Sequence, residues 1–268
     1  MHKVWALIRS NWLAASSYKL GFIFSFGSLI LSVIPIFFIT RALQTTMADV
    51  IRGQGDQYFA FLVVGLISLN VVSSTVYALP GGLQTATSTG TLEALLATPT
   101  SVTALLLGLS GYEVLFTMLR SAVMLVAAAV MGARVEWHQL GASLPIVALI
   151  VVAHLPIAII TAAMVLAFRT RGPLAQLVLM ASTFLGGVYY PTTVTGIPAP
   201  IKAISAFIPL TYGLTALRAV LLEGNSITTV WRELSILSAF TVVALIASAI
   251  GFRAALRYAR KVGNLAQY

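Results

Sequence analysis

Two charged side chains stand inside one long apolar segment of this sequence. Glu113 and Arg120 lie seven residues apart in the run 104–131, so a helix would place both on one face. About 10 Å of helix rise separates them, so each is expected to have another partner. An ion pair with a neighbouring helix is one interpretation. A role in a transport pathway is the other, since intramembrane charges are costly and mark functional sites.

A serine nucleophile with a histidine base is the second chemistry to weigh. The stretch Gly-Leu-Ser-Gly, 108–111, has the Gly-x-Ser-Gly form of rhomboid intramembrane proteases, with Ser110 as nucleophile and His154 as base. Counted from the same membrane face, Ser110 lies about 10 Å deep and His154 about 21 Å deep. Because the two groups need contact near ~3 Å, this arrangement disfavours a protease. We expect His154 to make an interhelical hydrogen bond instead.

Uncharged polar residues repeat at helical spacing in the first two apolar segments. Asn70, Ser74 and Tyr77 fall at i, i+4 and i+7, on one helix face. Polar side chains in apolar spans face protein or a cavity rather than lipid, so we expect this face to line a pathway between two copies of the chain. Close helix contact through small residues is the alternative. The candidate pathway residues are Ser25, Ser28, Ser32, Asn70, Ser74 and Tyr77.

The composition requires a membrane as the surrounding solvent. Of the 268 residues, 59% are hydrophobic and 9% are charged, and the mean hydropathy is +0.97. A soluble domain has about a quarter charged residues, so this chain cannot cover a globule with a wettable surface. The net charge of +9 fits basic residues beside membrane spans better than a nucleic-acid partner. The absence of cysteine excludes disulfides and thiolate sites, and residues 1–20 show no cleavable signal peptide.

Six segments are long and apolar enough to cross the hydrocarbon as helices, which takes about 20 residues. They cover residues 21–40, 58–79, 104–131, 145–168, 173–190 and 235–256. The chain is therefore predicted to be an all-α polytopic membrane protein with a single domain over residues 1–268. Residues 1–19 are predicted to form a helix in the membrane interface, because Trp5, Ile8 and Trp12 form one apolar stripe. An ordinary basic flank of the first span is the alternative.

The basic residues indicate which ends of the spans face the cytoplasm. On the side of the two termini lie Lys3, Arg9, Lys19, Arg169, Arg171, Arg253, Arg257, Arg260 and Lys261. On the other side, along longer loops that also hold acidic residues, lie Arg41, Arg52, Arg134, Lys202, Arg218 and Arg232. Lysine and arginine concentrate on the cytoplasmic side, so both termini are predicted to be cytoplasmic. The expected location is the bacterial cytoplasmic (inner) membrane.

A short amphipathic helix is predicted between spans two and three, in "GTLEALLATPTS", 90–101. Leu92 and the Leu95–Leu96 pair form one face, Glu93 lies in the first turn where the helix dipole favours an anion, and Pro99 ends the helix. Such a rigid element, 91–98, suits docking of a soluble partner, and a mere connector is the alternative. The residues expected to make this contact are Thr91, Leu92, Glu93, Leu95, Leu96, Thr98 and Pro99.

A proline-broken segment follows span five, "GGVYYPTTVTGIPAPIKAISAFIPLTYGLTALRAVLLEG", 186–224. Its two apolar runs are each too short to cross, which predicts a hairpin over 198–222 that dips into the membrane and returns. Broken backbone at that depth is tolerated only where protein or water satisfies it, so we expect an outer gate here. An amphipathic external loop is the alternative. The gate candidates are Tyr189, Tyr190, Pro191, Pro198 and Pro209.

Together these two stretches resemble the permease subunit of type-2 ABC exporters, the class that moves drugs, lipids, O-antigen or teichoic acid. The resemblance covers nearly the whole chain. In the first stretch it rests on Gly-Thr-Leu-Glu followed by a leucine pair and Thr-Pro, and in the second on Pro-Leu-Thr followed by Ala-Leu-Arg. It implies a half-transporter whose helix 91–98 couples to an ATPase, braced by the N-terminal helix, and whose hairpin 198–222 forms the outer gate.

The resemblance also implies partners for this chain. Two copies of an ATP-binding subunit would bind ATP and Mg²⁺, and a second permease copy would complete a homodimer. The chain itself has no G-x-x-x-x-G-K-[ST] phosphate loop, so it is expected to be no enzyme and to hold no cofactor. The serine-dotted spans favour an amphipathic, drug-like or lipid-linked cargo. An ion-coupled secondary transporter or channel is the alternative, but such proteins usually carry carboxylates in mid-span, and here only Glu113 comes close, near the end of its span.

Overall fold

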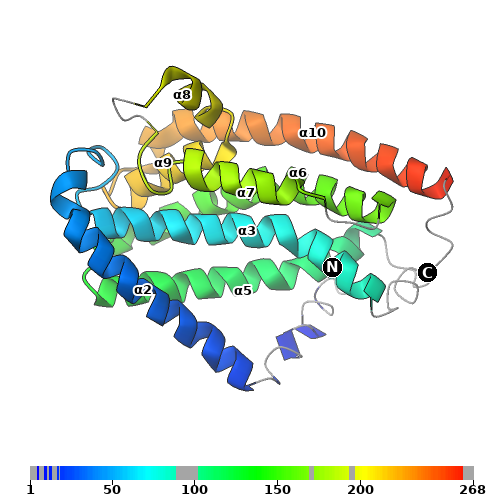
Figure 1. Cartoon of the computed structure of the whole chain (residues 1–268), viewed down its shortest axis with the longest axis horizontal. Coiled ribbons are helices and arrows are strands. Elements are labelled where there is room, and N and C mark those ends of the chain that lie inside the picture. The colour runs from blue at the N-terminus through cyan, green and yellow to red at the C-terminus, as the bar shows by residue number, and fades with distance from the viewer. Residues whose placement is uncertain are drawn as a thin grey trace.

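The computed structural model of the chain describes residues 19–88, 102–168, 172–192 and 197–261, with Trp5, Arg9, Ser10, Trp12, Leu13 and Ser17 before them. All regular elements among these residues are helices (Figure 1). The α-helices are α2 (Lys19–Met47), α3 (Tyr58–Ser88), α5 (Val102–Val130), α6 (Leu140–Phe168), α7 (Leu174–Leu185), α8 (Ala199–Ser205), α9 (Pro209–Leu221) and α10 (Trp231–Lys261). Two 3-10 helices, η1 (Trp137–Gln139) and η2 (Ile227–Val230), precede α6 and α10.

Five described helices are long and apolar enough to cross a membrane: α2, α3, α5, α6 and α10. Helices α8 and α9 make a sixth if this pair, bent by 83°, counts as one span. The predicted all-α polytopic membrane fold is therefore confirmed. The long helices run between the same two ends of the bundle, α3, α6 and α10 in one direction and α2 and α5 in the other (Figure 1). We call them the 47–58 end, where α2 ends and α3 begins, and the 88–102 end, where α3 ends and α5 begins.

Most spans extend further than predicted from hydropathy. Helix α2 continues from the expected end at residue 40 to Met47, and α3 continues from 79 to Ser88. The 29 residues of α2 cover about 44 Å at the rise of an α-helix, whereas the hydrocarbon is about 30 Å thick. The ends of these helices therefore extend beyond the hydrocarbon. Those ends contain polar residues, so a hydropathy scan does not assign them to the span.

The fifth predicted span, 173–190, is shorter than expected as a helix. Helix α7 has 12 residues, about 18 Å, and cannot cross the hydrocarbon alone. It ends at Leu185 because Gly186 and Gly187 follow, and Gly187 has φ +84°, a left-handed conformation that ends the helix. Residues 186–190 continue as irregular chain beside the other helices.

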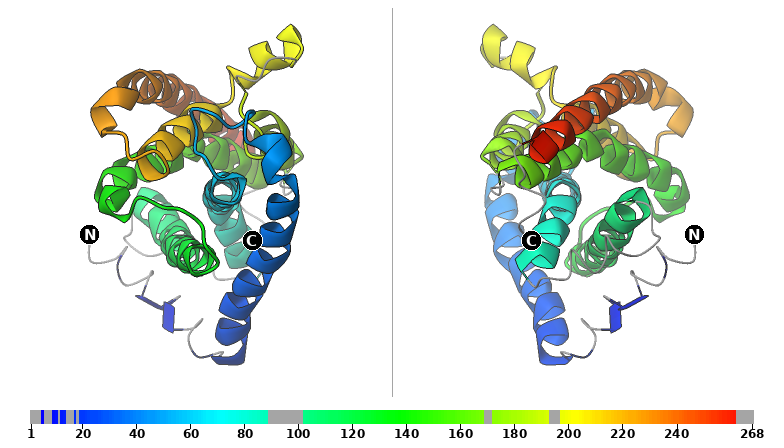
Figure 2. Two further views of the ribbon diagram at one scale, coloured as in Figure 1. Left: turned by 90° about the vertical axis from the view of Figure 1, so that its left-hand side faces the viewer. Right: turned by 90° about the vertical axis from the view of Figure 1, so that its right-hand side faces the viewer.

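Helix α3 forms the centre of the bundle (Figure 2). Its residues belong to both main hydrophobic clusters: Val64 and Val72 pack with α6, α9 and Leu237 of α10, and Val63 packs with Val33 of α2 and Met124 of α5. Helix α2 diverges from the bundle toward the 88–102 end (Figure 1). Its outward residues are therefore among the most exposed apolar side chains of the chain.

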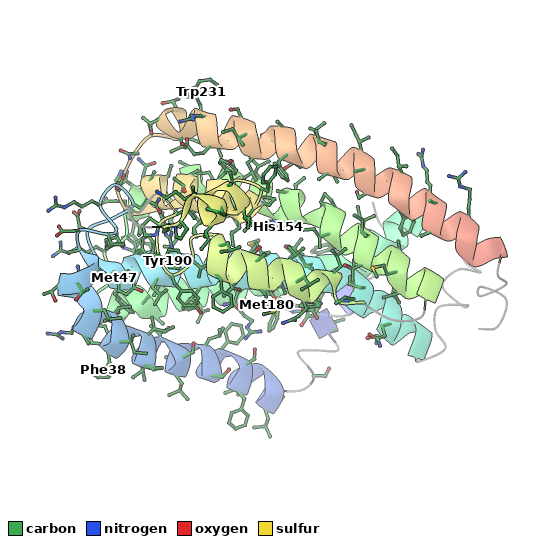
Figure 3. The ribbon with its side chains drawn as sticks, turned by 45° about the horizontal axis from the view of Figure 1, so that its top comes forward. Phe38, Met47, His154, Met180, Tyr190 and Trp231 are labelled. Atoms are coloured by element: carbon green, nitrogen blue, oxygen red, sulfur yellow. The ribbon has the colours of Figure 1, made fainter. Side chains whose placement is uncertain are left out.

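The exposed surface matches a bilayer rather than water. Leu31, Phe38 and Ile250 expose 61–65% of their area, and Phe38 points away from the bundle (Figure 3). Trp137 and Trp231 are exposed at the 47–58 end, beside the starts of α6 and α10. Tryptophan is enriched at the membrane–water boundary, so these residues mark where the hydrocarbon ends.

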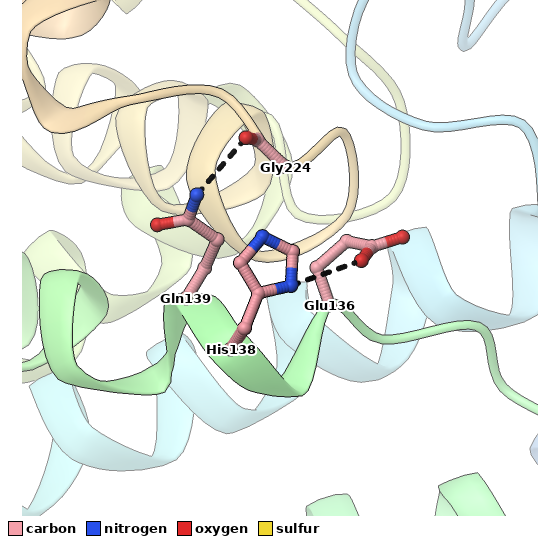
Figure 4. Close-up of polar contacts among 4 residues, drawn as sticks. All are labelled: Glu136, His138, Gln139 and Gly224. Carbon is pink, nitrogen blue, oxygen red and sulfur yellow. Dashed lines mark hydrogen bonds and ion pairs between the residues drawn. The ribbon is translucent and has the colours of Figure 1, made fainter.

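The connections at the 47–58 end fasten the end of α9. The main-chain N–H of Glu136 donates to the oxygen of Leu221 at 2.9 Å. The side-chain amide of Gln139 donates to the oxygen of Gly224 at 3.0 Å, next to a 3.4 Å contact between His138 and Glu136 (Figure 4). These contacts hold the turn after α9 against the segment that leads into α6.

Two predicted elements lie largely outside the described residues. The whole helix 91–98, with all seven docking candidates, falls in the undescribed stretch 89–101. Of the predicted interfacial helix 1–19, the structure describes a few separate residues between Trp5 and Ser17, and these are helical. Trp12 makes edge-to-face contacts with Tyr112 and Phe116 at ring-centroid distances of 6.3 and 6.5 Å. The N-terminal segment therefore touches α5.

Candidate functional site

The polar face of α3 and the charged face of α5 meet at one cavity, here called the inner cavity. It has a volume of about 210 Å³ and lies between α2, α3 and α5. Five predicted site residues line it: Asn70, Ser74, Tyr77, Glu113 and Arg120. The hydroxyl groups of Ser73, Thr117 and Ser121 add to its polar lining. Two helices thus contribute a concentration of polar groups inside otherwise apolar spans.

The two charges of the inner cavity lie at opposite ends of it. Helices α3 and α5 run antiparallel, so Asn70 and Arg120 lie toward the 47–58 end while Tyr77 and Glu113 lie toward the 88–102 end. Among the described residues, neither charge has an opposite charge within 4.0 Å. The predicted ion pair with a neighbouring helix is absent from that part of the chain.

Arg120 packs against an aromatic ring, and one of its nitrogen atoms lacks a hydrogen bond in the described part of the chain. Its guanidinium carbon lies 5.9 Å from the centre of the Phe116 ring, a cation–π contact. Its Nε is buried and finds no hydrogen-bond partner among the described residues. A buried donor without a partner is costly, so Arg120 is held in the helix bundle at the expense of one unmade hydrogen bond in the described part of the chain.

Tyr77 also contacts a further helix, whereas the predicted pathway serines of α2 lie away from the inner cavity. The Tyr77 hydroxyl donates to Oε1 of Gln176 at 2.9 Å and so links α3 to α7. The Ser28 and Ser32 hydroxyls donate to main-chain oxygens of their own helix, and both residues are exposed. Ser25 is half-buried and does not line the inner cavity. The structure therefore separates the serine stripe of α2 from the polar face of α3.

A second polar arrangement surrounds Arg218 of α9, which is 1% exposed. Its guanidinium donates to the main-chain oxygen of Phe61 at 3.0 Å through Nη2, and its carbon lies 3.3 Å from the centre of the Phe61 ring. It also donates to the oxygens of Gly187 at 2.7 Å and Val188 at 2.9 Å, and to Oε1 of Gln54 at 3.3 Å. In the described part of the chain, the hydrogen-bond acceptors of Arg218 are therefore all uncharged.

These bonds explain how the chain tolerates a broken helix among its spans. The irregular residues after α7 present carbonyl groups with no helical partner, and lipid offers none. Arg218 binds two of these oxygens, and the Tyr58 hydroxyl donates to a third, that of Tyr189, at 3.2 Å. The sequence analysis counted Arg218 with the basic residues on the side opposite the termini, although it also lies within the predicted hairpin 198–222. The structure corrects this: the residue is buried between α3, α9 and the 186–190 segment.

Gly65 permits this close approach. A Cβ atom at residue 65 would lie 2.6 Å from the Val188 oxygen and 2.7 Å from Nη2 of Arg218. Real Cβ atoms do not approach so closely, so α3 needs glycine where the broken segment crosses it. A sequence signal for this site existed: a lone arginine on the leucine face of an apolar helix, with Leu214, Leu217 and Leu221 at its helical neighbours.

The gate candidates frame the bent pair α8–α9. Pro198 precedes α8 with extended backbone, and Pro209 is the first residue of α9. Proline supports both helix starts and prevents one continuous helix, which gives the 83° bend. The Tyr190 hydroxyl donates to the Phe184 oxygen at 2.5 Å, Pro191 is buried, and Tyr189 is 38% exposed.

The remaining candidates are His154 and Ser110, of which the structure describes only the His154 side chain. His154 is fully buried, and its Nδ1 lies 2.7 Å from the Ile150 oxygen of the same helix. The expected interhelical hydrogen bond is therefore not made by Nδ1. The Ser110 side chain lies outside the described part. Within the described ranges, no cluster of three histidine, aspartate or glutamate residues is arranged for a metal ion.

Comparison with known proteins gives two matches. The family described as ABC-2 type transporter matches residues 2–222 of this chain. Nodulation protein J of Rhizobium meliloti (strain 1021) is 26% identical over 242 residues, which cover 89% of this chain and 88% of that protein. The family match spans the inner cavity, the Arg218 site and the stretch 90–101.

Proposed function

Because this chain belongs to the ABC-2 type transporter family, we propose that it is the permease of an exporter driven by separate ATP-binding subunits. As a membrane permease of that family, it supplies the spans of a transporter. We assign ATP hydrolysis to two partner chains, since no phosphate loop occurs in this sequence. A second copy of the permease completes the proposed transporter, in the bacterial cytoplasmic membrane.

The observation that carries this proposal is the family match over residues 2–222, because it includes "GTLEALLATPTS". In the proposed orientation, the 88–102 end and both termini face the cytoplasm, as the basic residues indicate. The helix 91–98 then lies where a cytoplasmic ATPase reaches it. The contact of Trp12 with α5 supports the role of the N-terminal segment as a brace beside this helix.

The proposed cargo is amphipathic. The inner cavity offers hydroxyl, amide and charged groups on one side of α3, and the outer face of α2 beside it is apolar. A molecule with a polar head and an apolar tail matches both surfaces at once. The bent pair α8–α9, with the segment 186–191, is the proposed outer gate.

Co-purification tests the proposal. The permease expressed with its neighbouring genes should bring down an ATP-binding subunit, and the purified complex should hydrolyse ATP in a vanadate-sensitive way. An ion-coupled carrier, which would use Glu113, should bring down no ATPase and should respond to an imposed proton or sodium gradient. Transport that follows the gradient and ignores vanadate would contradict the proposal.

A further inference from the structure

An apolar cleft between α5 and α6, here called the α5–α6 cleft, lies apart from the sites described above. Its volume is about 180 Å³. Met118 and Ala122 of α5 and Leu144 and Val147 of α6 form its walls, and residues of α3 and α9 form its floor. Helices α5 and α6 both pack against α3 but hardly touch each other in the described part of the chain. The cleft is the space that this arrangement leaves open.

The lining of the α5–α6 cleft is almost entirely apolar, although serine residues contribute to it. The Ser68 hydroxyl donates to the Val64 oxygen at 2.8 Å, and the Ser143 hydroxyl donates to the Leu140 oxygen at 2.8 Å. Each bond stays within one helix, so these two hydroxyls are satisfied without a ligand. The cleft therefore offers a surface for hydrocarbon and little that could hold a polar head group.

The connection between α5 and α6 explains why these two helices stay apart. The Gln57 side chain, directly before α3, donates to the Gly132 oxygen at 3.0 Å and accepts from the Arg134 N–H at 2.9 Å. The Glu136 N–H donates to the Leu221 oxygen at the end of α9. The connection is thus tied to α3 and α9, and the end of α9 is held in the gap, where Leu221 lines the cleft.

The mouth of the cleft is continuous with the surface that faces the membrane. Leu144 lines the cleft and is 66% exposed, and Leu119 and Val126 of α5, next in sequence to lining residues, are also exposed. Leu140, the first lining residue of α6, follows closely after Trp137, which marks the membrane boundary. The cleft therefore begins about one helical turn inside that boundary and opens toward the acyl chains of the leaflet at the 47–58 end.

Core side chains line the cleft, so leaving it empty would be costly. Val64, Ile150 and Leu217 line it and belong to the main buried cluster, each at most 3% exposed. Side chains beside a void lose the dispersion contacts that a close-packed interior provides. Water is a poor substitute, since an apolar cavity of ~150 Å³ stays dry and takes up benzene instead. In a bilayer, the hydrocarbon at the mouth is the substance that matches this cleft.

We propose that the α5–α6 cleft binds a segment of one acyl chain of a membrane phospholipid, and that this lipid stays with the protein as part of its core. Along α6 the lining runs from Leu140 to Ile150, about 15 Å of helix. This length suits an extended chain segment better than a compact ligand. The cleft lies on the α6 side of α3 and α5, whereas the inner cavity lies on their α2 side. The proposed site thus holds a resident lipid and does not depend on the export function.

Photo-cross-linking tests the proposal on the intact complex, reconstituted in phosphatidylethanolamine membranes. A small fraction of that lipid carries a diazirine in the middle of one acyl chain. Loosely bound lipid is removed by washing in detergent before illumination, and mass spectrometry of peptides locates the adducts. Val243 and Ile246, on the exposed face of α10, report contact with bulk lipid and serve as the reference positions.

We expect adducts on the cleft-lining residues of α5 and α6 to be severalfold more frequent after washing than adducts on α10. Val147→Phe, or Ala122→Phe on the opposite wall, fills the cleft and should reduce the cleft adducts severalfold. Val130→Phe, at an 84% exposed position of α5, is the matched control and should keep them. Cleft adducts no more frequent than those on α10, or unchanged in both filling variants, would overturn the proposal.

Thermal unfolding separates a bound lipid from a chance contact, since a ligand that binds only the folded state stabilises it. Exhaustive delipidation should lower the melting temperature of the wild type by several degrees, and added phosphatidylethanolamine should restore it. Val147→Phe should lose much less, because its ring replaces the chain, and equal losses would contradict the proposal. A second copy of the protein is the alternative occupant. Cross-linking of two copies through Ala122→Cys, the sole thiol of that variant, in place of lipid adducts would also overturn the proposal.

Discussion

Nη2 of Arg218 donates to the main-chain oxygen of Val188 at 2.9 Å, so a side chain of α9 completes the hydrogen bonding of the broken segment after α7. The same guanidinium binds the oxygens of Phe61 and Gly187. One guanidinium of α9 therefore binds main-chain oxygens of both α3 and the segment after α7. This arrangement makes Arg218 the residue on which the position of the proposed outer gate depends.

The substitution Arg218→Leu should strongly destabilise the protein. It leaves three buried carbonyls without their donor, which costs about 3 kcal/mol or more when each loses a bond to a charged group. Arg218→Lys should recover only part, because an ammonium group cannot bind a spread of acceptors as the planar guanidinium does. Thermal unfolding in detergent measures the loss. Arg232→Leu, an exposed arginine at the same end, is the matched control and should melt like wild type.

Gly65→Ala should be destabilising although alanine is the better helix former. The added Cβ would meet the Val188 oxygen and the Arg218 guanidinium, and overpacking of this kind costs about 1–3 kcal/mol. Gly81→Ala in the same helix has nothing within 4 Å of the added atom and should be neutral or stabilising by up to ~1 kcal/mol. Equal unfolding midpoints for the two variants would refute the proposed close contact.

Much of the fold could be predicted from the sequence, and the features that could not be predicted have physical reasons. The apolar runs predicted the spanning helices because the hydrocarbon thickness sets their length. Helix spacing also placed Asn70, Ser74 and Tyr77 on one face, and these residues do share a cavity with Glu113 and Arg120. Spacing within one helix says nothing about which neighbour it meets, so the cavity itself was not predicted.

The sequence could not predict the Arg218 site for a related reason. Its acceptors are main-chain oxygens, which every residue has, so no side-chain pattern announces them. Arg218 and Val188 are thirty residues apart, and Phe61 is farther still. Only the close approach at Gly65 brings these segments together. The available signal was the position of Arg218 within an apolar run. The sequence analysis used Arg218 only as one of the basic residues that indicate the orientation in the membrane.

The double substitution Asn70→Leu with Ser74→Leu should reduce export of the cargo at least about tenfold while the complex still assembles. Leucine removes two polar groups of the inner cavity and leaves the polar head to cross an apolar surface, which costs more than 1 kcal/mol per group. Export is compared at equal amounts of purified complex. Ser28→Leu with Ser32→Leu, on the exposed face of α2, is the control and should export normally. Unchanged export in the first pair would remove the inner cavity from the pathway.

Charge reversal at Glu93 should uncouple ATP hydrolysis from export without preventing membrane insertion. The prediction follows from the proposed docking role of the helix 91–98, where an anion in the first turn favours the helix. The ratio of ATP hydrolysed to cargo exported should rise severalfold in Glu93→Lys. Asp49→Lys at the opposite end, where the carboxylate makes an exposed pair with Arg52, provides the comparison and should leave the ratio unchanged.

Site-specific cross-linking gives the most direct test of the claim that a separate ATPase drives this permease. We would introduce a photoreactive amino acid at position 93 of the complex in native membranes. A second variant carries it at position 47 instead, as the control for the opposite end. ATPase-driven export predicts an adduct between position 93 and an ATP-binding subunit, sensitive to bound nucleotide, and none at position 47. Adducts of position 93 with lipid or with the permease alone, in membranes that export the cargo, would contradict it.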